Sequence, residues 1–278
     1  MKYFVLILGI LVSCQSDENP QSSNTAVREV RNITYNGVTV DLVIEKPNQT
    51  AADVLLVYHG TVMFDNQILQ AAHNTLTNFK NTLNRKDMMI ISVAYPEENL
   101  LFGDNILHAE AALLWVKNRA SQELGITVNK IFMAGHSQGG YLVTRLNTMH
   151  STHGVIANAP GPLNLNYRCS LEENGQIASG ITCSQLQSQY GTTIQNPDAY
   201  FQRSLLNFTQ AFQSDILFIQ GLNDSPIQMY SWPVFKQQVN QCTNCQERLF
   251  VEIEGQGHGA LFSSTTGKQA FNNFINSR

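Results

Sequence analysis

A serine with a glycine two positions away on each side gives the strongest chemical signal in this 278-residue sequence. The motif is Gly135-His-Ser137-Gln-Gly139, and it follows a short apolar run at residues 130–134. This spacing should arise by chance on the order of 0.1 times in a chain of this length, so the motif alone is only moderately specific. A strained turn between a strand and a helix would require both glycines, because larger side chains there would collide. The motif in this context predicts that Ser137 is a nucleophile for acyl transfer.

A histidine near the end of the chain is the predicted general base. His258 lies in the glycine-rich segment 255–259, directly after the apolar run 249–253. A base in a loop at the carboxyl edge of a sheet can reach back to a serine at the same edge. His136, beside the nucleophile, is expected to point away from it. The histidines at positions 73, 108, 150 and 153 fall in helical or loop stretches and are expected to be surface residues.

The acid that should orient the base follows the preceding apolar run, at residues 216–220. Asp224 is the predicted partner of His258, accepting its second imidazole N–H and stabilising the imidazolium. Asp215 would start that strand and so lie at the wrong edge of the sheet, and Asp198 is a distant second candidate. The order serine, acid, histidine along the chain agrees with this assignment.

An oxyanion created by attack on a carbonyl needs hydrogen-bond donors. Residues 57–61, Val-Tyr-His-Gly-Thr, end an earlier apolar run and supply one donor, the backbone N–H of Thr61. The backbone N–H of Gln138, at the start of the helix after the nucleophile, is the second predicted donor. His59 is expected to be structural rather than catalytic.

These groups require a scaffold that brings several strand ends together. Short apolar runs recur along the chain and are typical of strands buried on both faces of a parallel sheet; they cover residues 54–58, 88–94, 130–134, 154–157, 216–220 and 249–253. Helical patterns separate most of them, at residues 67–83, 105–124 (with Asp104 as N-cap), 138–149, 227–239 and 266–275. The sequence therefore predicts an α/β fold with a doubly wound, mostly parallel sheet. Residues 30–44 alternate between apolar and polar side chains, and Asn36-Gly37 lies within them. This segment predicts an antiparallel hairpin that precedes the parallel strands.

Residues 160–214 interrupt this alternation. About fifty residues separate two predicted strands there, with a short helical piece expected at 200–212. We expect a small insertion within the α/β domain, which would extend over residues 29–278. Either a lid over the site or an elaborated helix without a gating role fits this segment.

The chain begins with a lysine and an apolar run at residues 3–12, which is too short to span a bilayer. It fits a signal peptide covering residues 1–13. Leu11-Val-Ser-Cys14 resembles the lipobox of bacterial lipoproteins, in which the bond before the cysteine is cut and the cysteine carries lipid. The resemblance implies an exported protein anchored to a bacterial membrane, periplasmic or on the cell surface, by Cys14 and a flexible tether at 14–28. An ordinary signal peptide with a chance cysteine is the alternative.

Four further cysteines suit an exported, oxidising compartment. The predicted disulfides join Cys169 to Cys183 and Cys242 to Cys245. A four-thiolate zinc site is disfavoured because thirteen residues lie between the first two cysteines. A redox motif at Cys242 is disfavoured because it does not open a helix after a strand.

Composition excludes several function classes. The net charge of −4 comes without a basic patch, so no nucleic-acid partner is expected. Hydrophobic residues make up 43% of the chain, enough for a buried core. No phosphate-binding or metal-spaced motif is present, and no cofactor or metal is predicted. The oligomeric state is not predicted.

From about Val30 onward, the chain resembles the α/β-hydrolase superfamily. The elbow Gly135-His-Ser-Gln-Gly-Gly140 and the helix at 104–115 before it are similar to the catalytic domains of prolyl-oligopeptidase-like proteins and to small secreted esterases. The resemblance implies hydrolysis of an ester or amide through an acyl-enzyme. Full prolyl oligopeptidases carry a propeller before the hydrolase domain, whereas at most some thirty residues precede the first strand here, so an esterase acting on a small or polymeric ester is favoured over a peptidase. A binding module without catalysis is a further alternative, because fold alone does not give function.

Overall fold

The computed structural model describes residues 28–278. The predicted signal peptide, Cys14 and all but the last residue of the predicted tether lie outside the described residues. Among residues 28–278, no helix has both the length and the apolar character needed to cross a bilayer.

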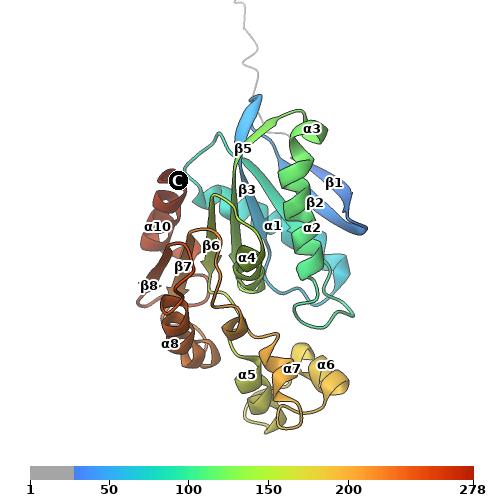
Figure 1. The fold of residues 1–278 in the computed structure, drawn as a ribbon, viewed down its shortest axis with the longest axis vertical. Coiled ribbons are helices and arrows are strands. Elements are labelled where there is room, and N and C mark those ends of the chain that lie inside the picture. Colours follow the sequence, from blue (N-terminus) through green and yellow to red (C-terminus); the bar gives the residue numbers. More distant parts are fainter. Residues whose placement is uncertain (1–27) are drawn as a thin grey trace, which may run out of the picture.

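The core of the fold is one sheet of eight strands in the order β1-β2-β4-β3-β5-β6-β7-β8 (Figure 1). β1 pairs with β2 and β2 with β4 in antiparallel fashion, and all other neighbours are parallel. The predicted fold class is thereby confirmed. The strands are β1 Arg28–Tyr35, β2 Val38–Glu45, β3 Ala51–Tyr58, β4 Met89–Ala94, β5 Thr127–His136, β6 Gly154–Asn158, β7 Ile216–Gly221 and β8 Arg248–Ile253.

A two-residue turn joins β1 to β2, as the sequence predicts. Tyr35 pairs with Val38 across the hairpin, and the two residues between them have positive φ, 50° for Asn36 and 81° for Gly37. Asn-Gly tolerates this left-handed backbone, which matches the twist of the flanking strands.

Helices cover both faces of the sheet because its central strands are apolar on both sides. Along β3, Val54, Leu56 and Tyr58 pack into one buried cluster with α2, α4 and α8. The intervening Leu55 and Val57 pack on the opposite face with α1, α9 and α10. These helices are α1 Ile68–Thr82 (preceded by the 3₁₀ turn η1 Asp65–Gln67), α2 Ile106–Asn118, α4 Gln138–Met149, α8 Pro226–Asn240, α9 Ala260–Ser263 and α10 Thr265–Asn276.

Two predicted helices differ in the structure. The helix expected at 105–124 breaks at Arg119, whose φ of −129° is not helical, so the segment forms α2 and the short α3 Ala120–Leu124. Its N-cap position is occupied by Asn105 instead of Asp104. The helix expected at 200–212 is also wrong. There α7 runs over Pro197–Phe201, and Ser204 has an extended backbone before the 3₁₀ turn η2 Leu205–Asn207, because Leu205 N–H bonds the Pro162 carbonyl instead of continuing a helix.

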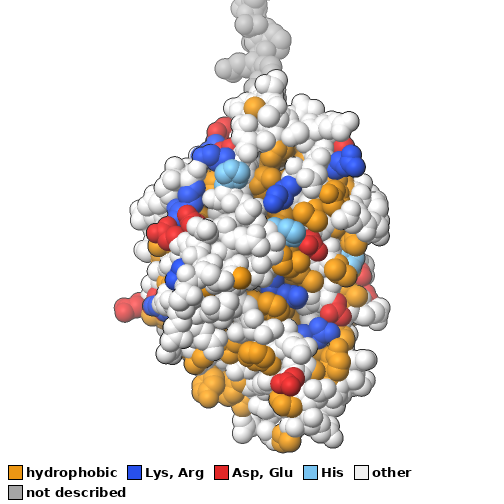
Figure 2. Space-filling model, viewed as in Figure 1, with side chains coloured by type: hydrophobic (Ala, Val, Ile, Leu, Met, Phe, Trp, Pro, Cys, Tyr) orange, Lys and Arg blue, Asp and Glu red, His pale blue; other side chains and the backbone are white. Residues whose placement is uncertain are grey.

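The residues between β6 and β7 form a group of short helices beyond one end of the sheet (Figure 1). This insertion comprises α5 Leu165–Glu173, α6 Ile181–Tyr190, α7 and η2. A disulfide between Cys169 and Cys183 ties α5 to α6. Apolar side chains are exposed over this end of the molecule (Figure 2), and Ile181, Ile194 and Phe201 are among the exposed ones in the insertion.

The second disulfide joins Cys242 to Cys245 in the loop between α8 and β8. Both pairs agree with the sequence prediction. The pairing leaves none of these four sulfur atoms as a thiolate for the zinc alternative.

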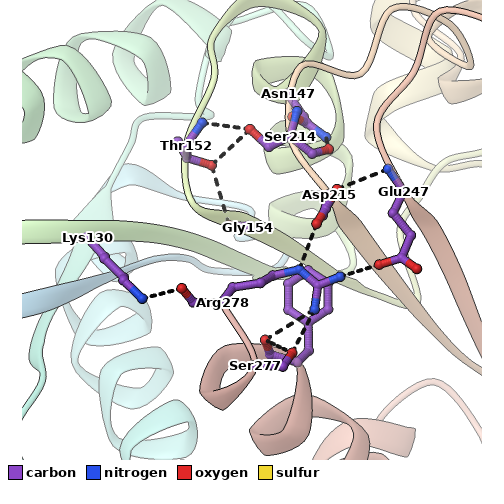
Figure 3. Close-up of polar contacts among 10 residues, drawn as sticks. Lys130, Asn147, Thr152, Gly154, Ser214, Asp215, Glu247, Ser277 and Arg278 are labelled. Atoms are coloured by element: carbon purple, nitrogen blue, oxygen red, sulfur yellow. Dashed lines mark hydrogen bonds and ion pairs between the residues drawn. The ribbon is translucent and has the colours of Figure 1, made fainter.

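An ion-pair network joins residues at the amino ends of β7 and β8, the end of the sheet away from the insertion (Figure 3). Asp215 accepts a hydrogen bond from Arg278 Nε at 2.9 Å and from the backbone N–H of Glu247 at 3.0 Å. The Arg278 guanidinium also pairs with the Glu247 carboxylate, and Lys130 Nζ donates to the Arg278 carbonyl. Asp215 therefore lies at the edge that the sequence predicted, away from the carboxyl ends of the strands.

The direction of winding reverses at β3. The chain leaves β3 to build β4 on one side, and β5 then adds to the other side of β3. Ligand sites of open α/β sheets lie at such reversals, outside the carboxyl ends of the strands. Ser137 follows β5 and Thr61 follows β3, so both lie at this point.

Candidate active site

Ser137 occupies a strained turn between β5 and α4. Its φ is 57° and its ψ is −118°, a region that residues with a side chain rarely adopt. A Cβ on Gly135 would lie 2.1 Å from the carbonyl of Gly139, and a Cβ on Gly139 would lie 2.1 Å from the Tyr58 carbonyl oxygen. No side chain fits at these distances. The steric argument made from the sequence for both glycines is therefore confirmed.

His258 and Asp224 form a hydrogen-bonded pair. Nδ1 of His258 lies 2.8 Å from Oδ2 of Asp224. The Asp224 side chain is 4% exposed, whereas that of His258 is 45% exposed, so the carboxylate is buried behind an accessible imidazole. Burial raises the pKa of Asp224, but hydrogen bonds from His258, Gln220 and the Ser225 N–H outweigh it and lower the pKa below its usual value. Asp224 is therefore ionised at neutral pH and can stabilise a positive charge on His258.

The loop carrying His258 is held against the end of β7. The Asn223 N–H donates to the Gln256 carbonyl at 2.8 Å, and the Leu222 N–H donates to the Ile253 carbonyl at 3.0 Å. A Cβ on Gly221 would lie 2.2 Å from the Gly257 carbonyl oxygen. Gly221 thus permits the close approach of the two loops that bear the acid and the base.

One cavity brings the three predicted catalytic residues together. It has a volume of about 580 Å³, and Ser137, Asp224 and His258 all line it. Thr61 and Met63 form the wall on the β3 side, and residues of the insertion, including Leu163, Arg168, Ile181 and Thr182, form another. The insertion therefore shapes the space in which a substrate would meet Ser137.

The two predicted oxyanion donors lie next to the nucleophile turn. A Cβ on Gly60 would be 3.5 Å from Cβ of Ser137, so the loop after β3 passes directly beside the nucleophile. Among the hydrogen bonds of residues 28–278, none uses the backbone N–H of Thr61 or of Gln138. Both N–H groups can therefore donate to a ligand atom without breaking a hydrogen bond within the protein.

The histidine after β3 is enclosed and neutral. His59 is 1% exposed and stacks on the Tyr95 ring with centroids 3.8 Å apart. Its Nδ1 lies 2.7 Å from the Gly60 carbonyl oxygen. Burial lowers the pKa of His59 to about 4. These contacts agree with a structural role that fixes the loop carrying Thr61.

His136, expected to point away from the nucleophile, lies beside the base. Its ring centroid is 4.8 Å from that of His258, and its Nδ1 accepts a hydrogen bond from Nδ2 of Asn158 at 2.8 Å. Burial, together with repulsion from His258, lowers the pKa of His136 to about 4. His136 is therefore a neutral neighbour that packs behind His258.

Sequence reasoning missed several polar residues that support the site. Asn158, at the end of β6, accepts from the Ser137 and Leu261 N–H groups through its backbone and side-chain oxygens. Gln220 donates to Asp224 at 2.9 Å from the end of β7. A single signal marks both of them, because each is a buried polar residue at the carboxyl end of an otherwise apolar strand.

No protein-family model matches the sequence, and no curated protein matches it. Solved structures do resemble the fold. A hyperthermophilic esterase from the archaeon Pyrobaculum calidifontis is 16% identical, with a TM-score of 0.65, and the match covers 90% of this chain and 82% of that one. A truncated form of a carbohydrate esterase from gut microbiota is 17% identical, with a TM-score of 0.65, over 92% of this chain and 98% of that one.

An acylaminoacyl peptidase from Pyrococcus horikoshii is 14% identical, with a TM-score of 0.65. That match covers 92% of this chain but 42% of the peptidase. At these identities the likeness is one of fold. The chain has the α/β-hydrolase fold.

Proposed function

We propose that this chain is a serine hydrolase that cleaves carboxylic esters through an acyl-enzyme on Ser137. The observation that carries the proposal is the Asp224–His258 pair at 2.8 Å, which lines the same cavity as a serine in a strained turn. Strained backbone of this kind clusters at active sites. The esterase structures of the same fold support the hydrolytic class.

The first half-reaction starts with substrate in the cavity beside Ser137. His258 removes the proton from the Ser137 hydroxyl as its oxygen attacks the ester carbonyl carbon. Asp224 holds Nδ1–H of the imidazole and stabilises the imidazolium that forms. The carbonyl oxygen becomes an oxyanion, which accepts hydrogen bonds from the backbone N–H groups of Thr61 and Gln138.

Collapse of this intermediate breaks the bond to the alcohol. His258 returns its proton to the leaving oxygen, and the acyl group stays on Ser137 as an ester. Water then enters, His258 removes one of its protons, and the same oxyanion donors act a second time. The carboxylic acid leaves, and Ser137 regains its proton from His258.

A small-molecule ester fits the cavity. The cavity volume of about 580 Å³ lies within the range of about 300–1,000 Å³ that is typical of small-molecule sites. The peptidase alternative finds support in the fold shared with the acylaminoacyl peptidase, and it predicts cleavage of an aminoacyl-proline anilide.

The test compares p-nitrophenyl acetate, butyrate and octanoate with an aminoacyl-proline anilide, using purified protein without residues 1–14. Ester turnover that disappears in Ser137→Ala supports the proposal, and the ranking of chain lengths measures the acyl pocket. Anilide cleavage with poor ester turnover would favour the peptidase. A folded protein that turns over neither and does not react with a fluorophosphonate would instead be a binding module.

We further propose that the enzyme is exported and anchored to a membrane through lipid on Cys14. The lipobox-like Leu11-Val-Ser-Cys14 supports this, as do the two disulfides, which are typical of oxidising compartments. Expressed in a bacterial host with radiolabelled palmitate, the full chain should incorporate label and partition into detergent. Label retained by Cys14→Ala would contradict the proposal.

A further inference from the structure

The Gln138 side chain connects the two predicted oxyanion residues. Its amide is satisfied when Oε1 accepts from Nδ2 of Asn105 at 2.8 Å and Nε2 donates to Oγ1 of Thr61 at 2.8 Å. In the same orientation Nε2 lies 3.1 Å from each carboxyl oxygen of Glu97. Gln138 and Asn105 are 2% and 3% exposed, so water does not compete for the bond between them. The four residues form one network beside the nucleophile turn, in which Gln138 and Asn105 are buried, Glu97 is half-buried and Thr61 is exposed.

A second, smaller cavity of about 160 Å³ lies behind this network. Thr61, Glu97, Asn105 and Gln138 line it, and Thr61 also lines the larger cavity that contains Ser137. The Glu97 side chain is only 10% exposed. The carboxyl group is therefore largely enclosed, next to the residues whose N–H groups would hold the oxyanion.

We propose, on the basis of the proposed function, that Glu97 is a positioning residue of the oxyanion hole. Through the Gln138 amide its carboxyl group fixes the Thr61 loop against the start of α4, and it does so in its uncharged form. A hole assembled in advance stabilises the oxyanion without reorganisation at the moment of reaction.

The surroundings of Glu97 favour the uncharged form. Burial raises its pKa most, a hydrogen bond from the Val62 backbone lowers it and the nearby Asp65 charge raises it, so that the pKa is about 8. His59 is 4.0 Å away but is itself neutral because burial lowers its pKa. The other titratable groups beside Glu97 are Glu98, which lines the same cavity, and the Tyr95 phenol. Among the described residues that line this cavity, none is a lysine or an arginine.

Ionisation of Glu97 has a direct consequence for the reaction. Above a pH of about 8 a negative charge appears on a carboxyl group that contacts the Gln138 amide. That charge repels the oxyanion forming at Thr61 and Gln138, in a site where screening by water is weak. The ground-state ester is neutral and is affected less, so kcat should fall while KM changes little.

The experiment measures kcat and KM for p-nitrophenyl butyrate between about pH 6 and about pH 10. The wild-type kcat should fall at least about threefold between about pH 7.5 and about pH 9. Glu97→Gln keeps an acceptor for the Gln138 amide and cannot ionise, so its kcat should not fall over this range. Glu98→Gln removes a neighbouring carboxylate that does not touch Gln138, and its profile should follow that of the wild type.

A second variant separates positioning from charge. Glu97→Leu has similar volume but no polar atom, so it should lower kcat by about tenfold at all pH values with KM nearly unchanged. Equal kcat for Glu97→Leu and Glu97→Gln at neutral pH would overturn the positioning role. A decline in kcat that persists in Glu97→Gln would overturn the charge effect.

Fluorophosphonate labelling of Ser137 at neutral pH is measured in parallel, together with circular dichroism to verify folding. A labelled, active wild type whose pH profile is unchanged in Glu97→Gln overturns this inference alone. A folded wild type that is neither labelled nor active overturns the proposed function, and this inference with it.

Discussion

Oδ2 of Asp224 lies 2.8 Å from Nδ1 of His258, although 34 positions separate the two residues in the sequence. The parallel pairing of β7 with β8 creates this proximity, because it brings the loops after both strands to the same edge of the sheet. Gln220 and the Ser225 N–H also donate to Asp224, so the carboxylate is oriented before any substrate binds.

Asp224→Asn should reduce kcat/KM by about 1,000- to 10,000-fold while leaving the fold intact. The amide cannot stabilise the imidazolium, and it favours the wrong imidazole tautomer. Steady-state ester hydrolysis measures the effect. Asp215→Asn is the matched control, because Asp215 lies at the other edge in the Arg278 network, and it should lower the melting temperature without lowering kcat. Similar activity for the two variants would contradict the assignment.

Gly221→Ala should reduce kcat by about 100-fold, since small misplacements of catalytic groups have effects of this size. The added Cβ would lie 2.2 Å from the Gly257 carbonyl oxygen and would displace the loop carrying His258. Gly259→Ala tests the same loop on the other side of His258, where a Cβ meets nothing within 4 Å. We expect near wild-type turnover for Gly259→Ala, and equal losses in both variants would refute the steric explanation.

Local patterns in the sequence predicted most of the sheet and the three residues of the proposed triad. Glycine spacing around Ser137 has a steric cause within the turn itself, and Asp224 and His258 each follow an apolar run that is long enough to identify as a strand. The helix predicted at 200–212 failed for a different reason. Its backbone groups bond to Pro162 and Leu163, which are about forty residues earlier in the chain and invisible to a local pattern.

Glu97 should make the free energy of unfolding fall as pH rises. The pKa of Glu97 is about 8 in the folded chain and 4.5 in the unfolded chain. Between these pH values the folded state therefore holds one proton more than the unfolded state. Relative to Glu97→Gln, the wild type should lose about 1.4 kcal/mol for each pH unit in this window and nothing further above it. Urea unfolding of both proteins across the window measures the difference. Parallel curves would contradict the raised pKa.

The Cys169–Cys183 disulfide should matter more for substrate binding than the Cys242–Cys245 disulfide. It closes the longer loop, with a separation of 14 residues against 3, so its removal should cost about 3 kcal/mol against about 2. Ile181 and Thr182 of the tethered helix line the Ser137 cavity. Cys169→Ala/Cys183→Ala should therefore raise KM more than it lowers kcat. An unchanged KM would show that the insertion does not shape the substrate site.

The network around Glu97 could not be predicted from the sequence. Glu97 and Asn105 come from the segment after β4, Thr61 from the segment after β3 and Gln138 from the start of α4, and no spacing relates the three segments. Their contact depends on β4 lying beside β3 while β5 lies on the other side, which places the loops after these strands together. Asn158 and Gln220 could have been found, because a polar residue that ends a buried strand is already unusual.

Reaction of the protein with a fluorophosphonate tests the central proposal most directly. The Ser137 oxygen would attack phosphorus, fluoride would leave, and a stable adduct would form only if His258 and the oxyanion donors activate that serine. Peptide mass mapping should place one adduct per chain on Ser137, with ester turnover lost in proportion to labelling and no adduct in Ser137→Ala. A folded protein that turns over esters but carries no adduct on Ser137, or whose Ser137→Ala variant keeps its turnover, would contradict the account.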